Sequence, residues 1–100
     1  MKIKYIQTGG FAGLTKIAEI DTDKLSANEA EVYKKFIKES DFFNIPSIDD
    51  SRSLPDVENI IIKVEDEGKS HSVRFNILNI PNKLKPLVDN LQKLAKIKKR

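Results

Sequence analysis

Three of the chain's four glycines lie within five positions, at Gly9, Gly10 and Gly13. Residues 2–7 before them and residues 14–20 after them each have the pattern of a β-strand. Glycine is favoured where φ is positive or where the backbone approaches another group closely. A short glycine-rich connection between two strands therefore predicts a β-hairpin.

The aromatic Phe11 lies among these glycines, and a hairpin does not need it. Its ring either folds onto the core or is offered to a partner, and the glycines around it favour contact by backbone as well as ring. The Gly-Gly-x-x-Gly spacing differs from the G-x-G-x-x-G of dinucleotide folds, and no Gly-Lys-Ser/Thr follows it. We therefore expect no nucleotide site.

The length of 100 residues predicts one domain, residues 1–100. Hydrophobic residues make up 39% and charged residues 33%, which is typical of a globular chain without a membrane segment. The absence of cysteine excludes disulfides and is compatible with a cytoplasmic location, which we expect.

Basic residues gather in a tail over residues 93–100, which holds five of the eighteen lysines and arginines. Without these five, 13 basic residues face 15 acidic ones, a net charge of −2. The tail either binds nucleic acid or forms a solvated helix end whose lysines suit the negative end of the helix dipole. We favour the helix end, because neither stacking aromatics nor a recognition helix accompanies the basic residues.

A first helix is predicted from the capping box of Ser26 and Glu29. It ends near residues 40–41, and Phe42-Phe43 is expected to close the core below it before Pro46 stops any continuation. Its apolar positions recur at helical spacing: Ala30, Tyr33, Phe36 and Ile37.

The second half predicts a polar loop over residues 47–56, a strand over 57–65 and an alternating strand over 70–77. A short turn at Pro81 and a helix from about Pro86 follow. Its apolar stripe is Leu84, Leu87, Val88, Leu91, Leu94 and Ala95. The order ββαββα predicts an α+β fold, a four-stranded antiparallel sheet with two helices packed on one face. The sequence leaves open which strands are central.

The sequence gives little support for a catalytic site or a metal site. His71 is the only histidine, there is no cysteine, and a zinc site needs three or four such ligands. Ser70 and Ser72 flank His71 on a strand and so point away from it, which excludes a triad. The acidic residues between 49 and 58 lack the spacing of a calcium loop. We therefore expect no enzyme, no metal, no cofactor and no small-molecule substrate, with His71 at the edge of the core.

Gly9-Gly10-Phe11-Ala12-Gly13 after an N-terminal strand resembles the signature of emfourins, protein inhibitors of protealysin and other thermolysin-like metalloproteases. Ile60 departs from the family pattern, which often has an aromatic residue there, and the basic tail lies outside it. Further fragments fit in order: Phe42-Phe43-x-Ile45-Pro46, Pro55-Asp56, Gly68-Lys69-x-His71-x-Val73 and Pro81-x-x-Leu84-x-Pro86-Leu87-x-x-x-Leu91.

The resemblance implies a bacterial, cytoplasmic, non-enzymatic inhibitor of enzymes that hold zinc in a long cleft and favour a large apolar side chain after the scissile bond. We expect a monomer in which Phe11 anchors the contact and the neighbouring backbone pairs with the enzyme, without chelating zinc. The predicted protease-binding residues are Gly9, Gly10, Phe11, Ala12, Gly13 and Leu14, with a second contact from Asp49, Asp50 and Arg52.

Two other classes remain open from the sequence. A small nucleic-acid-binding or ribosome-associated domain would use the basic tail, and its binding would weaken steeply with salt. An assembly module would pair through a sheet edge.

Overall fold

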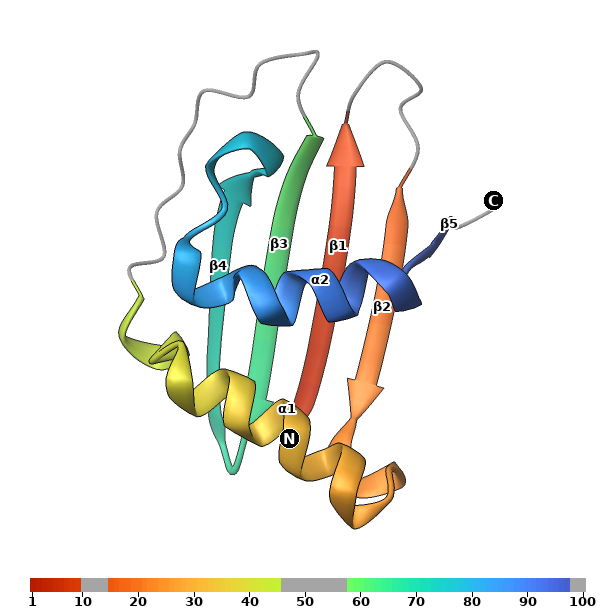
Figure 1. Ribbon diagram of the computed structural model, residues 1–100, viewed down its shortest axis with the longest axis vertical. Helices are drawn as coiled ribbons and strands as arrows, with labels where there is room; N and C mark the ends of the chain where they lie inside the picture. The colour runs from red at the N-terminus through yellow and green to blue at the C-terminus, as the bar shows by residue number, and fades with distance from the viewer. Residues whose placement is uncertain (10–14, 46–57, 98–100) are drawn as a thin grey trace.

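A computed structural model describes residues 1–9, 15–45 and 58–97 of the chain. Figure 1 labels its strands and α-helices, and short 3-10 helices, called η in the text, connect them. In chain order these elements are β1 (Lys2–Gly9), β2 (Lys16–Asp21), η1 (Thr22–Lys24), α1 (Ala27–Glu39), η2 (Phe42–Asn44), β3 (Glu58–Asp66), β4 (Lys69–Asn76), η3 (Ile77–Asn79), η4 (Asn82–Leu84), α2 (Lys85–Leu94) and β5 (Lys96–Ile97).

The strands form one antiparallel sheet in the order β4-β3-β1-β2-β5. The two predicted hairpins, β1–β2 and β3–β4, are joined through β1 and β3, which are therefore the central strands. The α+β class and the ββαββα order are confirmed. The structure adds the strand order and the two-residue strand β5 at the edge beside β2.

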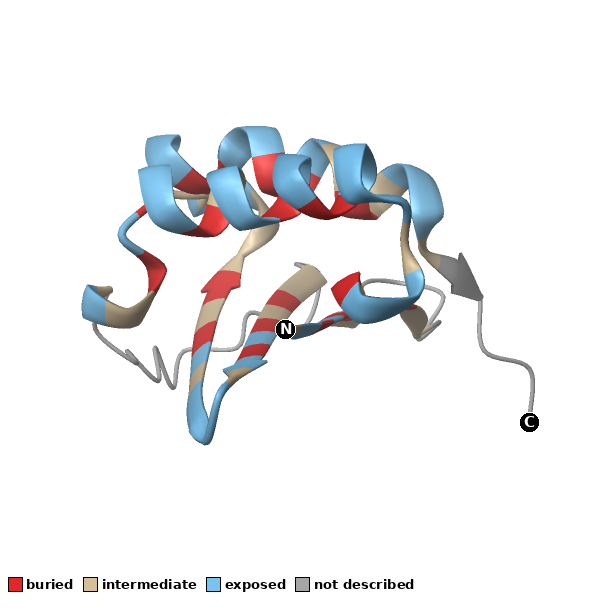
Figure 2. Cartoon of the chain, turned by 90° about the horizontal axis from the view of Figure 1, so that it is seen from below, coloured by how far each residue is buried: buried red, intermediate tan, exposed pale blue. Residues whose placement is uncertain are grey.

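Both helices lie on the same face of the sheet and leave the other face without a helix (Figures 1 and 2). The core forms between them because alternate strand residues point to the helical side. Helix α1 contributes Tyr33 and Ile37, and α2 contributes Leu87, Val88 and Leu91. The buried strand residues are Ile3, Tyr5, Ala18, Ile20, Ile60, Ile62, Val64, Val73 and Phe75.

The ends of α1 follow the predicted signals. Ser26 caps its start, with the hydroxyl accepting a hydrogen bond from the Glu29 amide at 3.3 Å. The helix ends at Ser40, and Asp41 adopts the left-handed conformation with φ of 53°. Phe42 is then buried and Phe43 partly buried, which confirms that this pair closes the core.

Three details of the second half differ from the prediction. Ile77 belongs to η3 and not to the strand, which ends at Asn76. Leu94, predicted in the apolar stripe, is 48% exposed because it lies in the last turn of α2. The helix stops there because Ala95 is extended, so of the basic tail only Lys93 lies in its last turn, whereas Lys96 belongs to β5.

Candidate functional site at the loop end of the sheet

We call the sheet end where β1 and β4 finish and β2 and β3 begin the loop end (Figure 1). Gly9 pairs with Glu58 across β1 and β3. Gly9 directly precedes residues 10–14, and Glu58 directly follows residues 46–57. The two segments that carry the predicted contacts are therefore attached to neighbouring strands at one end of the sheet.

Of the predicted contact residues, the structure describes only Gly9. Its φ of 103° explains why glycine ends β1, because side chains rarely tolerate this conformation. The other predicted contacts lie outside the described residues: Gly10, Phe11, Ala12, Gly13, Leu14, Asp49, Asp50 and Arg52.

A buried hydrogen-bond chain connects β1 with the start of β3 at this end. The Tyr5 hydroxyl donates to Gln7 Oε1 at 2.6 Å, and Gln7 Nε2 in turn donates to Glu58 Oε2. Tyr5 is fully buried and Gln7 is 6% exposed, so these bonds form where polar groups without partners are costly. These two hydrogen bonds fix the Glu58 side chain at the residue where the backbone enters β3.

The environment of Tyr5 keeps its hydroxyl protonated. Burial raises the pKa of Tyr5 above the ordinary value of 10.0, and the negative charge of Glu58 raises it further. A hydrogen bond with the side chain of Gln92 on α2 opposes this shift. A neutral Tyr5 remains a hydrogen-bond donor to Gln7 throughout the neutral pH range.

Sequence reasoning did not identify this hydrogen-bond chain. Gln7 is visible in the sequence as an exception. It follows Ile3 and Tyr5 on the inward-facing side of β1, where an apolar residue is expected. Its partner Glu58 lies 51 residues away, and that pairing is visible only in the fold.

We call the face of the sheet that neither helix covers the open face. The side chains on it differ between the loop end and the opposite end. At the loop end, Thr8 and Thr15 approach with their hydroxyl oxygens 3.4 Å apart. In the next row across the strands, Ile6 pairs with both Ile17 and Ile61, all three half-buried, and Arg74 continues the row on β4. The apolar residues of the open face thus lie nearer the loop end than the opposite end.

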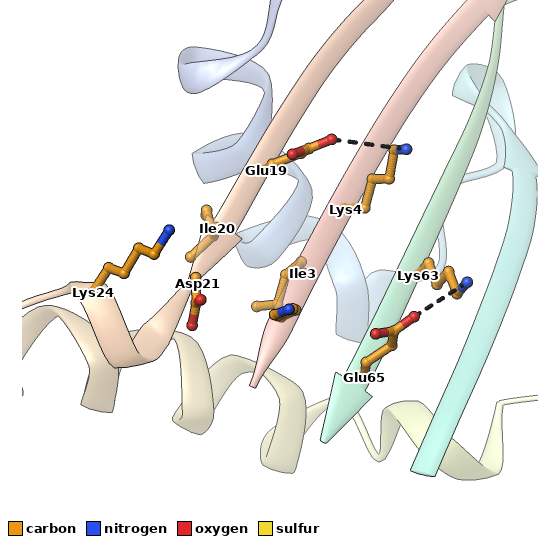
Figure 3. A pocket seen from close by; sticks show the side chains of 9 residues that line it. Ile3, Lys4, Glu19, Ile20, Asp21, Lys24, Lys63 and Glu65 are labelled. Carbon is orange, nitrogen blue, oxygen red and sulfur yellow. Dashed lines mark ion pairs between the residues drawn. The ribbon is translucent and has the colours of Figure 1, made fainter. Parts of the chain in front are cut away.

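Toward the opposite end the open face is charged and carries a hollow of about 520 Å³ (Figure 3). Lys4 pairs with Glu19 at 3.7 Å and Lys63 with Glu65 at 3.3 Å, all four being well exposed. Such exposed ion pairs contribute little, typically about 0–1 kcal/mol. We therefore interpret this hollow as ordinary solvated surface and not as a binding site.

His71 holds the other end of the segment that precedes β3. Its Nε2 lies 2.6 Å from the carbonyl oxygen of Ile45, the last described residue before residue 46. The Phe42 ring packs edge-on against the imidazole at a centroid distance of 5.6 Å. The expected position of His71 at the edge of the core is confirmed, and the side chain anchors backbone there.

Within residues 1–9, 15–45 and 58–97, no three histidine, cysteine or acidic side chains gather as metal ligands would. Over the same residues, no helix has the length and apolar character needed to cross a membrane.

The fold and this site define a small α+β scaffold in which Gly9 and Glu58, the strand residues next to two connecting segments, pair at one end of the sheet. The emfourin family model matches residues 5–92, so the chain belongs to the emfourin family. Emfourins are an inhibitor family, and membership suggests a metalloprotease inhibitor. No curated protein and no solved structure matches the chain.

Proposed function

We propose that the protein inhibits a thermolysin-like zinc metalloprotease of the protealysin type by blocking its active-site cleft. The family match over residues 5–92 is the observation that carries this proposal. Residues 9–14 supply the contact, with Phe11 as apolar anchor and the glycine backbone pairing with the enzyme.

The loop end supports this mechanism because an inhibitor loses less entropy on binding when its contact segment is held beforehand. Gly9 is fixed in the β1–β3 register opposite Glu58, and the Thr8 and Thr15 side chains meet beyond it. The buried Gln7–Glu58 hydrogen bond secures the same strand ends from the helical side. A second contact comes from Asp49, Asp50 and Arg52.

The inhibition does not involve capture of the zinc ion. His71, the chain's only histidine, is engaged with the Ile45 carbonyl and packs against Phe42. There is no cysteine in the chain. The protein therefore acts by blocking the cleft, and the enzyme keeps its metal.

The test is to titrate thermolysin and a protealysin-like enzyme with the purified protein and to measure residual activity. Stoichiometric loss of activity that persists in excess zinc is the expected result. If both enzymes stay fully active at a large molar excess of the protein, the proposed function is wrong.

A variant lacking residues 98–100 is the matched control for the basic tail, because it leaves β5 (Lys96–Ile97) in place. It is expected to inhibit as well as the full chain. Salt-sensitive binding to nucleic acid that disappears with this deletion, in a protein that inhibits neither enzyme, would instead favour the nucleic-acid class.

A further inference from the structure

Leu78 is the most exposed large apolar side chain of the described residues, with 74% of its surface accessible. The two others that are exposed in these residues, Val32 and Leu94, reach 45% and 48%. Single exposed apolar side chains are common on protein surfaces. Leu78 differs from the other two in its surroundings and in its place on the sheet.

The turn that carries Leu78 is held in place from both sides. The Asn76 side-chain oxygen accepts a hydrogen bond from the Leu78 amide at 3.1 Å. Ile77 and Ile80 pack against the core on either side of it. Leu78 is therefore presented to solvent on a fixed backbone, which lowers the entropy lost when a partner covers it.

The sequence segment that carries Leu78 is uncharged. Residues 75–82 contain no acidic or basic residue, although a third of the whole chain is charged. Val32 follows Glu31 in a helix rich in lysine, and Leu94 lies directly after Lys93. Depletion of charge around an apolar residue is the composition found at the centres of protein interfaces.

The turn lies at the loop end. Asn76 pairs with Asn59, which is the neighbour of Glu58, and Glu58 pairs with Gly9. Two strand spacings, or about 10 Å, thus separate β4 from β1 at this end. A standard interface covers about 800 Å² on each partner, which is wide enough to include the ends of both strands.

We propose that Leu78 is a second apolar contact with the inhibited metalloprotease. This rests on the proposed function and extends it to a residue outside the glycine-rich segment. The occupant is the same protease molecule that residues 9–14 engage.

The test compares inhibition constants for Leu78→Asp, Leu78→Ala and Leu78→Met, with Val32→Asp as the matched exposed control on α1. Leu78→Asp is expected to weaken inhibition by about 30-fold, Leu78→Ala by about tenfold and Leu78→Met by less than about threefold. Val32→Asp is expected to inhibit like the unmodified chain. Thermal unfolding of each variant checks that the fold is intact.

Unchanged inhibition by folded Leu78→Asp and Leu78→Ala, while the unmodified chain inhibits, overturns this inference and leaves the proposed function standing. An equal loss from Val32→Asp also overturns it, because the effect then does not depend on the loop end. If the unmodified chain does not inhibit, the proposed function fails and this inference fails with it.

Discussion

The two ends of the sheet are built with different chemistry. At the loop end, the described contacts are hydrogen bonds among Tyr5, Gln7 and Glu58, and the exposed Leu78 lies in an uncharged turn. At the opposite end, which we call the hairpin end, β3 and β4 join through the tight turn at Glu67 and Gly68.

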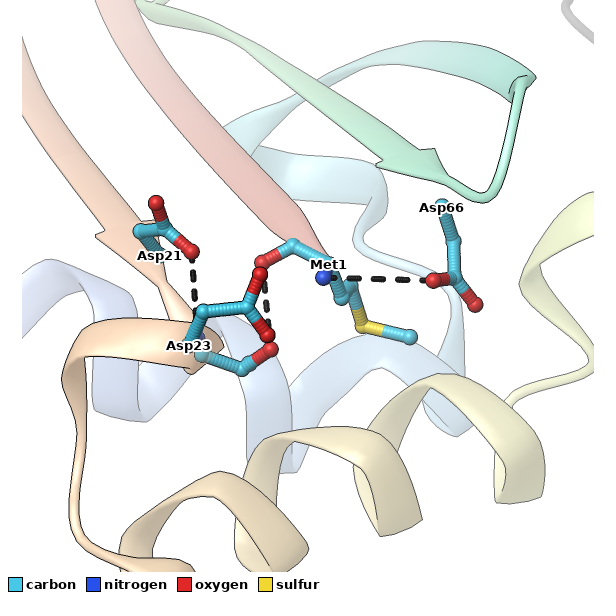
Figure 4. A network of polar contacts seen from close by, with 5 residues as sticks. Met1, Asp21, Asp23 and Asp66 are labelled. Atoms are coloured by element: carbon cyan, nitrogen blue, oxygen red, sulfur yellow. Dashed lines mark hydrogen bonds and ion pairs between the residues drawn. The ribbon is translucent and has the colours of Figure 1, made fainter.

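The start of the chain makes an ion pair and a backbone hydrogen bond at the hairpin end. The Met1 amino group lies 3.9 Å from an Asp66 carboxylate oxygen, and the Met1 carbonyl accepts a hydrogen bond from the Thr22 amide at 2.9 Å (Figure 4). Helix α1 crosses the sheet near this end (Figure 1). This end is closed by contacts between residues far apart in the sequence, and Thr22 is buried there.

Under the proposed function, one small sheet carries both a contact surface and a solvated surface. A protein partner favours a preorganised backbone, and at the loop end the Gln7–Glu58 hydrogen bond joins the ends of β1 and β3. Substitutions at the loop end are therefore expected to weaken inhibition, whereas substitutions at the hairpin end are expected to change only the stability of the protein.

The largest effect is expected from Gln7→Leu. It keeps the volume of Gln7 but leaves the buried Tyr5 hydroxyl and the Glu58 carboxylate without this partner. The free energy of unfolding is expected to fall by about 3 kcal/mol, measured by urea denaturation, and inhibition to weaken with it. Adding Tyr5→Phe removes the hydroxyl and is expected to recover part of the loss. A decrease below about 0.5 kcal/mol would show that the hydrogen-bond chain does not hold the loop end.

Phe11→Ala separates binding from folding. Loss of the proposed anchor is expected to weaken binding to the protease by about 2 kcal/mol, or roughly 30-fold in Kd, measured by titration of the enzyme. Stability is expected to change by less than about 0.5 kcal/mol. Full inhibition by a folded Phe11→Ala variant would place the anchor elsewhere.

Gly68→Ala probes the hairpin end. Gly68 has φ of 80°, and a Cβ added there meets no atom within 4 Å, so the cost comes from the backbone alone. Stability is expected to fall by about 1 kcal/mol, seen as a lower Tm, while the inhibition constant stays the same. A loss of inhibition as large as that of Phe11→Ala would break the division between the two ends.

The smallest effect is the contribution of the two tyrosines to the pH dependence of stability, which is seen only at alkaline pH. Burial raises the pKa of Tyr5, with a further contribution from Glu58, and burial followed by the charge of Glu29 raises that of Tyr33. Because each pKa is higher in the folded state, their contribution to stability is complete below pH 10.0 and is lost as pH rises through the folded values.

The free energy of unfolding is thus expected to be unaffected by tyrosine up to about pH 10 and to fall beyond it. Urea denaturation across the alkaline range measures this, and Tyr5→Phe removes the share due to Tyr5. Ultraviolet titration of the two tyrosines at ordinary exposed pKa values would contradict the effect of burial.

Much of the fold could be predicted because its signals are local. Ser26 and Glu29 mark the start of α1, and the alternation of Ile60, Ile62 and Val64 marks the buried face of β3. Each hairpin likewise follows from its own turn. The sequence of a hairpin does not determine which of its two strands pairs with the other hairpin. The central pairing of β1 with β3 therefore cannot be predicted from these local signals.

The candidate site could be predicted only in part for the same reason. The glycine-rich segment is a local feature, and Gly9 indeed ends β1 with positive φ. The Gln7–Glu58 hydrogen bond joins residues far apart in the sequence. The exposure of Leu78 depends on where β4 ends, and the alternating pattern continues past that point to Ile77.

The central claim is that the loop end is the surface that meets the protease. Amide hydrogen exchange of the protein, alone and bound to the inhibited enzyme, tests it most directly. The account predicts slower exchange on binding in residues 7–17, 58–60 and 76–80, with no change around the Glu67-Gly68 turn. Protection centred on that turn or on α1, with the loop end unchanged, would contradict the account.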